Sequence, residues 1–243
     1  MTSPFTAYMA EAYPIVCKGK LHVGTLMGGV PSDPKVAKAW IETKVTADDD
    51  QIRAMVAETM IERGVTKDEA VDIVNDLRNL VGFKRDGKGL YIEGRQLKAA
   101  MKEAISVAVA AGKLRQRSWG ETKKFITSYF PEHVFVQETR LHLFADEACT
   151  THVVEPSGIE QRFVHSRYGA AISYSEYVTE PYIPFTVVTD HLFTEKEWAM
   201  IWLTGQQNGL GASRSQGYGT YDVVAWDVEI DKKWLAKKKK SED

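Results

Sequence analysis

The segment with the clearest binding chemistry is a glycine-rich stretch, residues 209–219, with the sequence GLGASRSQGYG. Its four glycines allow positive φ and let backbone N–H groups approach a ligand closely. Two serines and Arg214 can donate hydrogen bonds to phosphate oxygens, and Tyr218 offers an aromatic face for a base. A plain connection between two elements needs only about 2–6 residues. The length of this segment therefore favours ligand binding over a simple linker.

A second feature is the basic segment 81–125, in which eleven Lys and Arg residues stand against four Asp and Glu. Concentrated positive charge suits a polyanion, because counterions released from phosphates supply affinity. Lys98 and Lys102 share one face of a predicted helix, with Arg95 one turn earlier, and Lys88 lies in a preceding turn. The start of that helix is itself a possible phosphate site. An ordinary solvated helix face remains the alternative.

Motifs for catalysis and metal binding give little support for an enzyme. The segment 82–89 fits the first seven positions of a P-loop, but it lacks the final Ser/Thr and leads into a strand. No HExxH motif and no nucleophile elbow occurs. Cys17 and Cys149 form no CxxC pair, so a structural zinc site is not expected. We expect no catalysis, no metal and no cofactor.

Two helices must position these candidates. Residues 94–111 repeat apolar side chains at helical spacing, with Gly112 at the end of the helix. A last helix begins at Thr194, and Glu197 three residues later completes a capping box. Its predicted buried stripe consists of Trp198, Ile201, Trp202 and Gly205.

Alternating patterns predict the strands. They are expected at 13–26, 90–92, 133–144, 150–155, 160–166, 171–178, 183–191 and 220–230. Their order with the two helices (strand, helix, strands, helix, strand) predicts an α+β fold with a ferredoxin-like, RNA-recognition-motif core.

The rest of the chain is expected to form additions to this core within one domain that spans residues 1–243. A helical insertion is predicted at 46–82, with one helix ended by Gly64 and the next begun by a Thr66–Glu69 capping box. Its second apolar stripe consists of Val74, Leu77, Leu80 and Val81. Further expectations are a short helix at 35–44, a projecting β-hairpin at 150–166 that turns around 155–158, and a basic tail at 232–243.

Three motifs carry a family resemblance. The glycine-rich segment between a helix and a strand resembles the signature loop of the RAMP superfamily, whose members form the backbone of CRISPR effector complexes. Residues 91–100 are similar to that family's approach to its first helix, with Glu93 in place of the usual proline. Residues 21–29 are similar to its first strand. The three matches occur in the family's order and span most of the chain.

The resemblance implies sequence-tolerant binding of single-stranded RNA or single-stranded DNA, with several copies lined up along the strand as a linear or helical oligomer. The expected nucleic-acid-binding residues are Lys88, Arg95, Lys98, Lys102, Gly209, Gly211, Ser213, Arg214, Ser215, Gly217 and Tyr218.

Two alternatives to simple binding remain open. One is a RAMP-type ribonuclease, for which the resemblance points to Asp33 in the loop after the first strand. Asp33 before Pro34 also fits an ordinary helix cap. His22 is the other catalytic candidate, as a general base, although a half-buried strand histidine is the simpler interpretation. The second alternative is a protein-interaction module that binds no nucleic acid.

Composition sets the remaining expectations. The chain has 243 residues and a formal net charge of −2. It shows neither a signal peptide nor an apolar run of the ~20 residues that a membrane span needs. A cytoplasmic protein without membrane partners is expected.

Overall fold

The computed structural model describes residues 8–31, 50–77, 80–115, 118–119, 124–166 and 169–236. The chain divides into two compact units. The core unit comprises Met1–Leu26, Arg85–Glu155 and Thr179–Asp243, and the second unit comprises Met27–Lys84 and Pro156–Val178. The single-domain organisation of the whole chain stays a prediction.

A four-stranded antiparallel sheet with the spatial order β14–β1–β13–β9 forms the centre of the core unit. Its strands are β1 (Ile15–Val23), β9 (Val134–Val136), β13 (Tyr182–Thr189) and β14 (Tyr221–Ile230). In sequence, α5 (Gly94–Ala110) lies between β1 and β9, and α7 (Glu195–Asn208) lies between β13 and β14. This βαββαβ order is that of the ferredoxin-like fold. The predicted fold class is confirmed.

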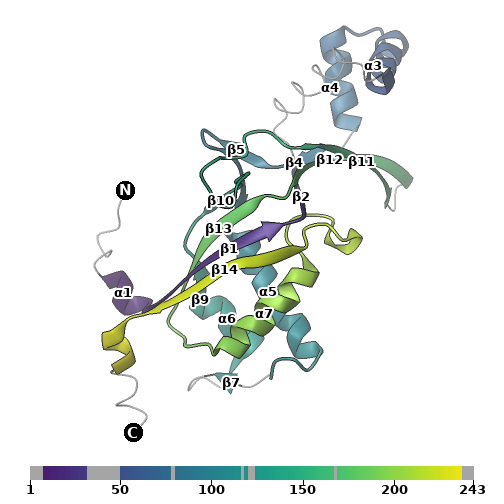
Figure 1. Ribbon diagram of the computed structural model, residues 1–243. Helices are drawn as coiled ribbons and strands as arrows, with labels where there is room; N and C mark the ends of the chain where they lie inside the picture. The colour runs from purple at the N-terminus through teal and green to yellow at the C-terminus, as the bar shows by residue number, and fades with distance from the viewer. Residues whose placement is uncertain are drawn as a thin grey trace. The chain divides into compact units, whose positions relative to one another are not determined.

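Helices α5 and α7 lie side by side against the sheet (Figure 1). Each begins with a capping box, and that of α7 is the predicted one, in which Thr194 Oγ1 accepts from the Glu197 N–H. The apolar side chains predicted for the two helices are buried. The 3.6-residue period of the sequence therefore selects the faces that pack.

Other elements of the core unit surround this sandwich. They are α1 (Met9–Ala12), β2 (Thr25–Met27), β5 (Lys84–Asp86), β6 (Gly89–Glu93), β7 (Ser118–Trp119), β8 (Lys124–Phe125), α6 (Ile126–His133) and β10 (Arg140–His142). The last residue of β2 and the first of β5 belong to the second unit. Strands β10, β6 and β5 form a small sheet in that order, and β7 pairs with β8.

The second unit contains two helices and a sheet. Helices α3 (Asp50–Arg63) and α4 (Lys67–Leu77) pack through Val56, Ala70, Val71 and Val74. The sheet has the order β11 (Gly158–Ser166), β12 (Gly169–Thr179), β4 (Leu80–Gly82) and β3 (Val30–Pro31). The Thr66–Glu69 capping box is confirmed, with Thr66 N donating to Glu69 Oε2 at 2.8 Å.

The hairpin predicted around residues 155–158 is wrong. Strand β11 pairs with β12 along its whole length, from Gly158 opposite Tyr177 to Ser166 opposite Gly169. The segment 150–155 forms no strand, because the N–H groups of Thr150 and Thr151 donate to the Asp146 carboxylate. Leu90 N further ties this segment to the start of β6 by donating to Val153 O at 2.8 Å.

Two further expectations need correction. Leu80 and Val81, placed at the end of a helical stripe by their spacing, lie in β4 and pair with β12 in parallel. The strand expected over 133–144 is divided into β9 and β10, after a helix, α6, that was not predicted. The division follows from Glu138, whose carboxylate accepts the Thr186 N–H at 2.9 Å and ends the pairing of β9 with β13.

Candidate nucleic-acid interface

The glycine-rich loop follows α7 directly and has backbone geometry that glycine favours. Gly209, Gly211, Gly217 and Gly219 have φ values between +75° and +88°. Ser213 also has positive φ, and a short 3₁₀ turn, Arg214–Gln216, follows it. Positive φ strains residues that carry a Cβ, so glycine at these four positions lowers the strain that the shape of the loop imposes.

Hydrogen bonds close the base of the loop and tie it to β2. Leu210 N donates to Gly219 O and Gly219 N donates to Thr25 O, both at 2.8 Å. The Leu210 side chain is 1% exposed. The loop is therefore anchored at its two ends and projects its central residues, including the exposed Ser215.

The structure brings this loop against α5. A cavity of about 170 Å³ lies between them, lined on the helix by Gln96, Ala99, Ala100 and Glu103 and on the loop by Gly209, Leu210, Gly211 and Arg214. Arg214 Nη1 forms an ion pair with Glu103 Oε2 at 2.6 Å. The sequence predicted that the loop and this helix meet, but not that a carboxylate would hold the arginine.

The other predicted cations are placed differently. Arg95 pairs with the Glu93 carboxylate at 2.5 Å, and Lys102 is exposed on α5. Lys88 lies in the exposed turn between β5 and β6, where its backbone N–H donates to Asp86. That hydrogen bond and the smaller effects of the hydrogen bonds from Arg140 and His142 hold the pKa of the Asp86 carboxyl well below its ordinary value.

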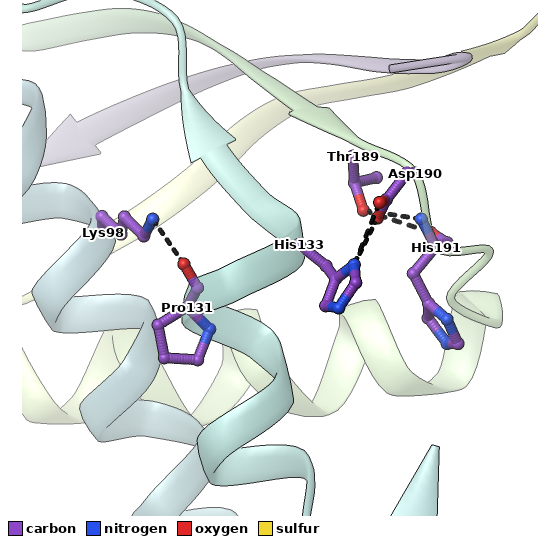
Figure 2. A network of polar contacts seen from close by, with 6 residues as sticks. All are labelled: Lys98, Pro131, His133, Thr189, Asp190 and His191. Carbon is purple, nitrogen blue, oxygen red and sulfur yellow. Dashed lines mark hydrogen bonds and ion pairs between the residues drawn. The ribbon is translucent and has the colours of Figure 1, made fainter. Parts of the chain in front are cut away.

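Lys98 turns away from the glycine-rich loop. Its Nζ donates to Pro131 O in α6 at 2.8 Å, as Figure 2 shows, and lies 4.1 Å from the centre of the Phe135 ring. Burial lowers the pKa of this amine. With Arg95 it lines a different cavity, of about 330 Å³, between α5 and β9. The predicted basic group is thus divided between two sides of α5.

The start of α5 is not the open phosphate site that the sequence suggested. The Gly94 N–H donates to Thr139 O at 3.1 Å. The Glu93 carboxylate caps the first turn, and Gln96 completes the capping box. Glu93, which replaces the family's usual proline, thereby puts negative charge where a phosphate would bind.

Of the two catalytic candidates, only His22 lies in the described part of the chain. The His22 ring stacks on Tyr182, with ring centres 4.4 Å apart, and the two residues are cross-strand neighbours. This contact gives His22 a structural role in the sheet. Asp33, the predicted helix 35–44 and the lysines 237–240 lie outside the described residues.

A histidine–carboxylate pair was missed by sequence reasoning. His133 Nδ1, at the end of α6, lies 2.8 Å from Asp190 Oδ1 after β13 (Figure 2). The Tyr129 ring stacks on the His133 ring with centres 3.7 Å apart. The two partners are 57 residues apart, and no local spacing signals such a pair. Within the described ranges, no three His, Cys, Asp or Glu residues gather in a way that could hold a metal ion.

Comparisons with known proteins agree with the class of fold that the core unit defines, an α+β fold of ferredoxin-like type. No family model and no curated protein matches the sequence. Among solved structures, the chain is similar to one in the cryo-EM structure of the Type III-B Cmr-beta bound to cognate target RNA, with a TM-score of 0.50 and 11% identity. The match covers 93% of this chain and 64% of that chain. At this identity the likeness concerns the fold.

None of the helices in the described part of the chain has the length and apolar character that crossing a bilayer requires.

Proposed function

We propose that this protein binds single-stranded RNA on the surface formed by the glycine-rich loop and the exposed side of α5. The observation that carries the proposal is the packing of the loop against α5, where Arg214 lies beside the helix. Ser215 of the same loop and Lys102 of α5 are both exposed. RNA is chosen over DNA because the chain of similar fold belongs to a complex bound to target RNA.

Arg214 can exchange its present partner for a phosphate. The side chains of Arg214 and Glu103 are 33% and 47% exposed. Ion pairs this exposed contribute only about 0–1 kcal/mol. A charge-assisted hydrogen bond from arginine to a phosphate is among the stronger polar contacts. Glu103 therefore competes with RNA for Arg214 but does not block it.

The proposed biological setting is a multi-subunit RNA-guided effector, in which copies of the chain line up along the RNA. The fold likeness and the family motifs support this setting. Opposed basic and acidic segments suit head-to-tail contacts between copies, which generate open helical assemblies unless rotation closes them.

The test is fluorescence anisotropy of a labelled single-stranded RNA with the full chain and with Arg214→Ala and Glu103→Gln, at two salt concentrations. Arg214→Ala should weaken binding about tenfold, roughly 1.4 kcal/mol, and reduce the salt slope by about 0.7, the value for one phosphate contact on a single strand. Glu103→Gln should tighten binding several-fold because it frees Arg214.

Glu58→Gln is the matched control. It removes the same charge from an exposed position on α3, so it should change affinity by less than about twofold. Equal effects of Glu103→Gln and Glu58→Gln would show that only net charge matters. Absence of binding would favour the protein-interaction alternative. Stronger binding to DNA of the same sequence would change the substrate class.

The proposed activity is binding without cleavage. RNA should remain intact after long incubation with the wild-type protein, as judged on a denaturing gel. Cleavage that disappears in His22→Ala or Asp33→Ala would establish the ribonuclease alternative instead.

A further inference from the structure

A second surface of the core unit is apolar. A groove of about 690 Å³ runs between α7 and β14. Its walls include Phe193, Trp198, Trp202, Leu203, Trp226 and Val228. The rings of Trp198 and Trp202 lie 4.9 and 5.1 Å from that of Trp226, measured between centres. Tryptophans gathered at a groove are typical of the central residues of protein interfaces.

The groove is open because β14 is an edge strand. In the described part of the chain β14 pairs only with β1, on its inner side, and it follows the border of the sheet beside α7 in Figure 1. Leu203, Val224 and Val228 are 56%, 42% and 38% exposed. A ten-residue strand with an unpaired edge and exposed apolar side chains is suited to accept another strand.

Charge restricts what can bind there. Every charged side chain on β14 is acidic, namely Asp222, Asp227 and Glu229. Phosphates would be repelled by this strand. A second copy that paired edge to edge would bring the two acidic strands together, which is unfavourable.

Strand β1 shows what a neighbour of β14 requires. Lys18 stands opposite Asp227 in the register and forms an ion pair with Glu229 at 2.6 Å. The side chains of Cys17 and Leu21 point the other way and are fully buried. The neighbour on the inner edge therefore alternates basic and apolar residues.

We propose that the outer edge of β14 and the adjacent groove bind an extended segment of a partner protein that alternates apolar and basic residues. Its apolar side chains fill the groove beside α7, and its basic side chains face Asp227 and Glu229. A second copy cannot supply β1 for this purpose, because β1 lies inside its own sheet. This binding goes beyond the proposed RNA binding, since it uses a different surface and a different class of partner.

The test uses the full chain and a synthetic peptide that copies Ile15–Val23 with Cys17→Ser. This first peptide is called the lysine peptide. A second one, the glutamate peptide, also carries Lys18→Glu and Lys20→Glu. A ten-nucleotide uridine oligomer serves as the RNA probe. Hydrogen exchange of the β14 amides and tryptophan fluorescence report on binding. The lysine peptide should slow exchange in β14 while β1 remains protected, and the glutamate peptide should bind at least tenfold more weakly.

Variants of exposed residues make the test specific. Leu203→Glu should lose peptide binding at least tenfold yet bind RNA like the wild type, and Asp227→Lys should prefer the glutamate peptide. Ile61→Glu, at an 83% exposed position in α3, is the control and should have no effect. Equal binding of the two peptides, no protection of β14, or protection by RNA alone would overturn the proposal. A dimer that forms without peptide and is lost in Leu203→Glu would assign the groove to a second copy.

Discussion

Helix α7 contributes to two surfaces of opposite chemistry. Its C-terminal end leads into the glycine-rich loop, where Arg214 lies beside α5. Its outer side lines the apolar groove along β14. The loop surface depends on backbone geometry and one exchangeable arginine, whereas the groove depends on apolar area and an acidic strand. Because both surfaces belong to one fold and differ in local charge, we expect charge, more than the fold, to decide which class of partner each surface accepts.

The largest expected effect concerns the loop. At Gly219 a Cβ would collide with the backbone carbonyl of Leu210, and φ is +75°, so Gly219→Ala must displace the loop. We expect a loss of about 2–4 kcal/mol in the free energy of unfolding and loss of RNA binding, with the stability measured by urea denaturation.

Gly217→Ala is the matched control for that change. Gly217 has φ of +88° but open space around its Cα, so alanine there should cost only about 1–2 kcal/mol. RNA binding should largely survive. Equal losses for the two variants would mean that backbone strain alone, and not the packing of the loop base, determines the shape of the surface.

The next effect concerns the buried face of α7, on which Gly205 lies. A Cβ at Gly205 would collide with the Tyr221 hydroxyl, and Ala104 of α5 also lies within contact distance. Although alanine favours a helix, Gly205→Ala should lower the free energy of unfolding by about 1–3 kcal/mol and widen the spacing of α7 and β14. Urea denaturation and tryptophan fluorescence would measure both consequences.

Tyr221→Phe provides the check on that mechanism, because it removes the oxygen that the new Cβ would meet. The double variant should recover at least about 0.5 kcal/mol relative to additivity. Strict additivity of the two changes would indicate that α5, and not β14, sets the position of the helix.

Helices α5 and α7 could be predicted well, because capping residues and 3.6-residue periodicity are local signals. Thr194 with Glu197, and the buried stripe from Trp198 to Gly205, are examples. Helix α6 was missed. It is short, and Pro131 inside it is a residue that normally ends helices. The true partner of β11 was also missed, because strand pairing depends on register between segments and not on either segment alone.

The candidate site could be predicted in part. The glycine-rich loop was recognised from its residues, and its approach to α5 follows from the fold. The pairing of Arg214 with Glu103 joins positions 111 residues apart and leaves no local pattern. Lys98 and Lys102 were assigned to one face because residues four apart are neighbours on a helix. That rule does not predict that Lys98 donates to Pro131 O and packs against the Phe135 ring, away from the glycine-rich loop.

The smallest expected effect is that of Lys98→Met, which removes a positive charge from α5 just as Arg214→Ala removes one from the loop. Because Lys98 lies beside β9 and not beside the loop, affinity for RNA should change by less than about twofold, against about tenfold for Arg214→Ala. A comparable loss for the two variants in the anisotropy assay would mean that RNA crosses the whole exposed side of α5.

Stability should also change little in Lys98→Met, by about 0.5 kcal/mol or less, because two effects oppose each other. Methionine loses the hydrogen bond to Pro131 O but no longer carries a charge that burial disfavours, and it keeps contact with the Phe135 ring.

Burial lowers the pKa of Lys98 in the folded protein, so below its ordinary pKa of about 10.4 the unfolded chain holds this proton more tightly. The wild type should therefore gain stability relative to the variant as pH rises from 8 toward that value. A difference between the two proteins that stays constant over this range, measured by urea denaturation, would show that Lys98 is solvated like an ordinary surface lysine.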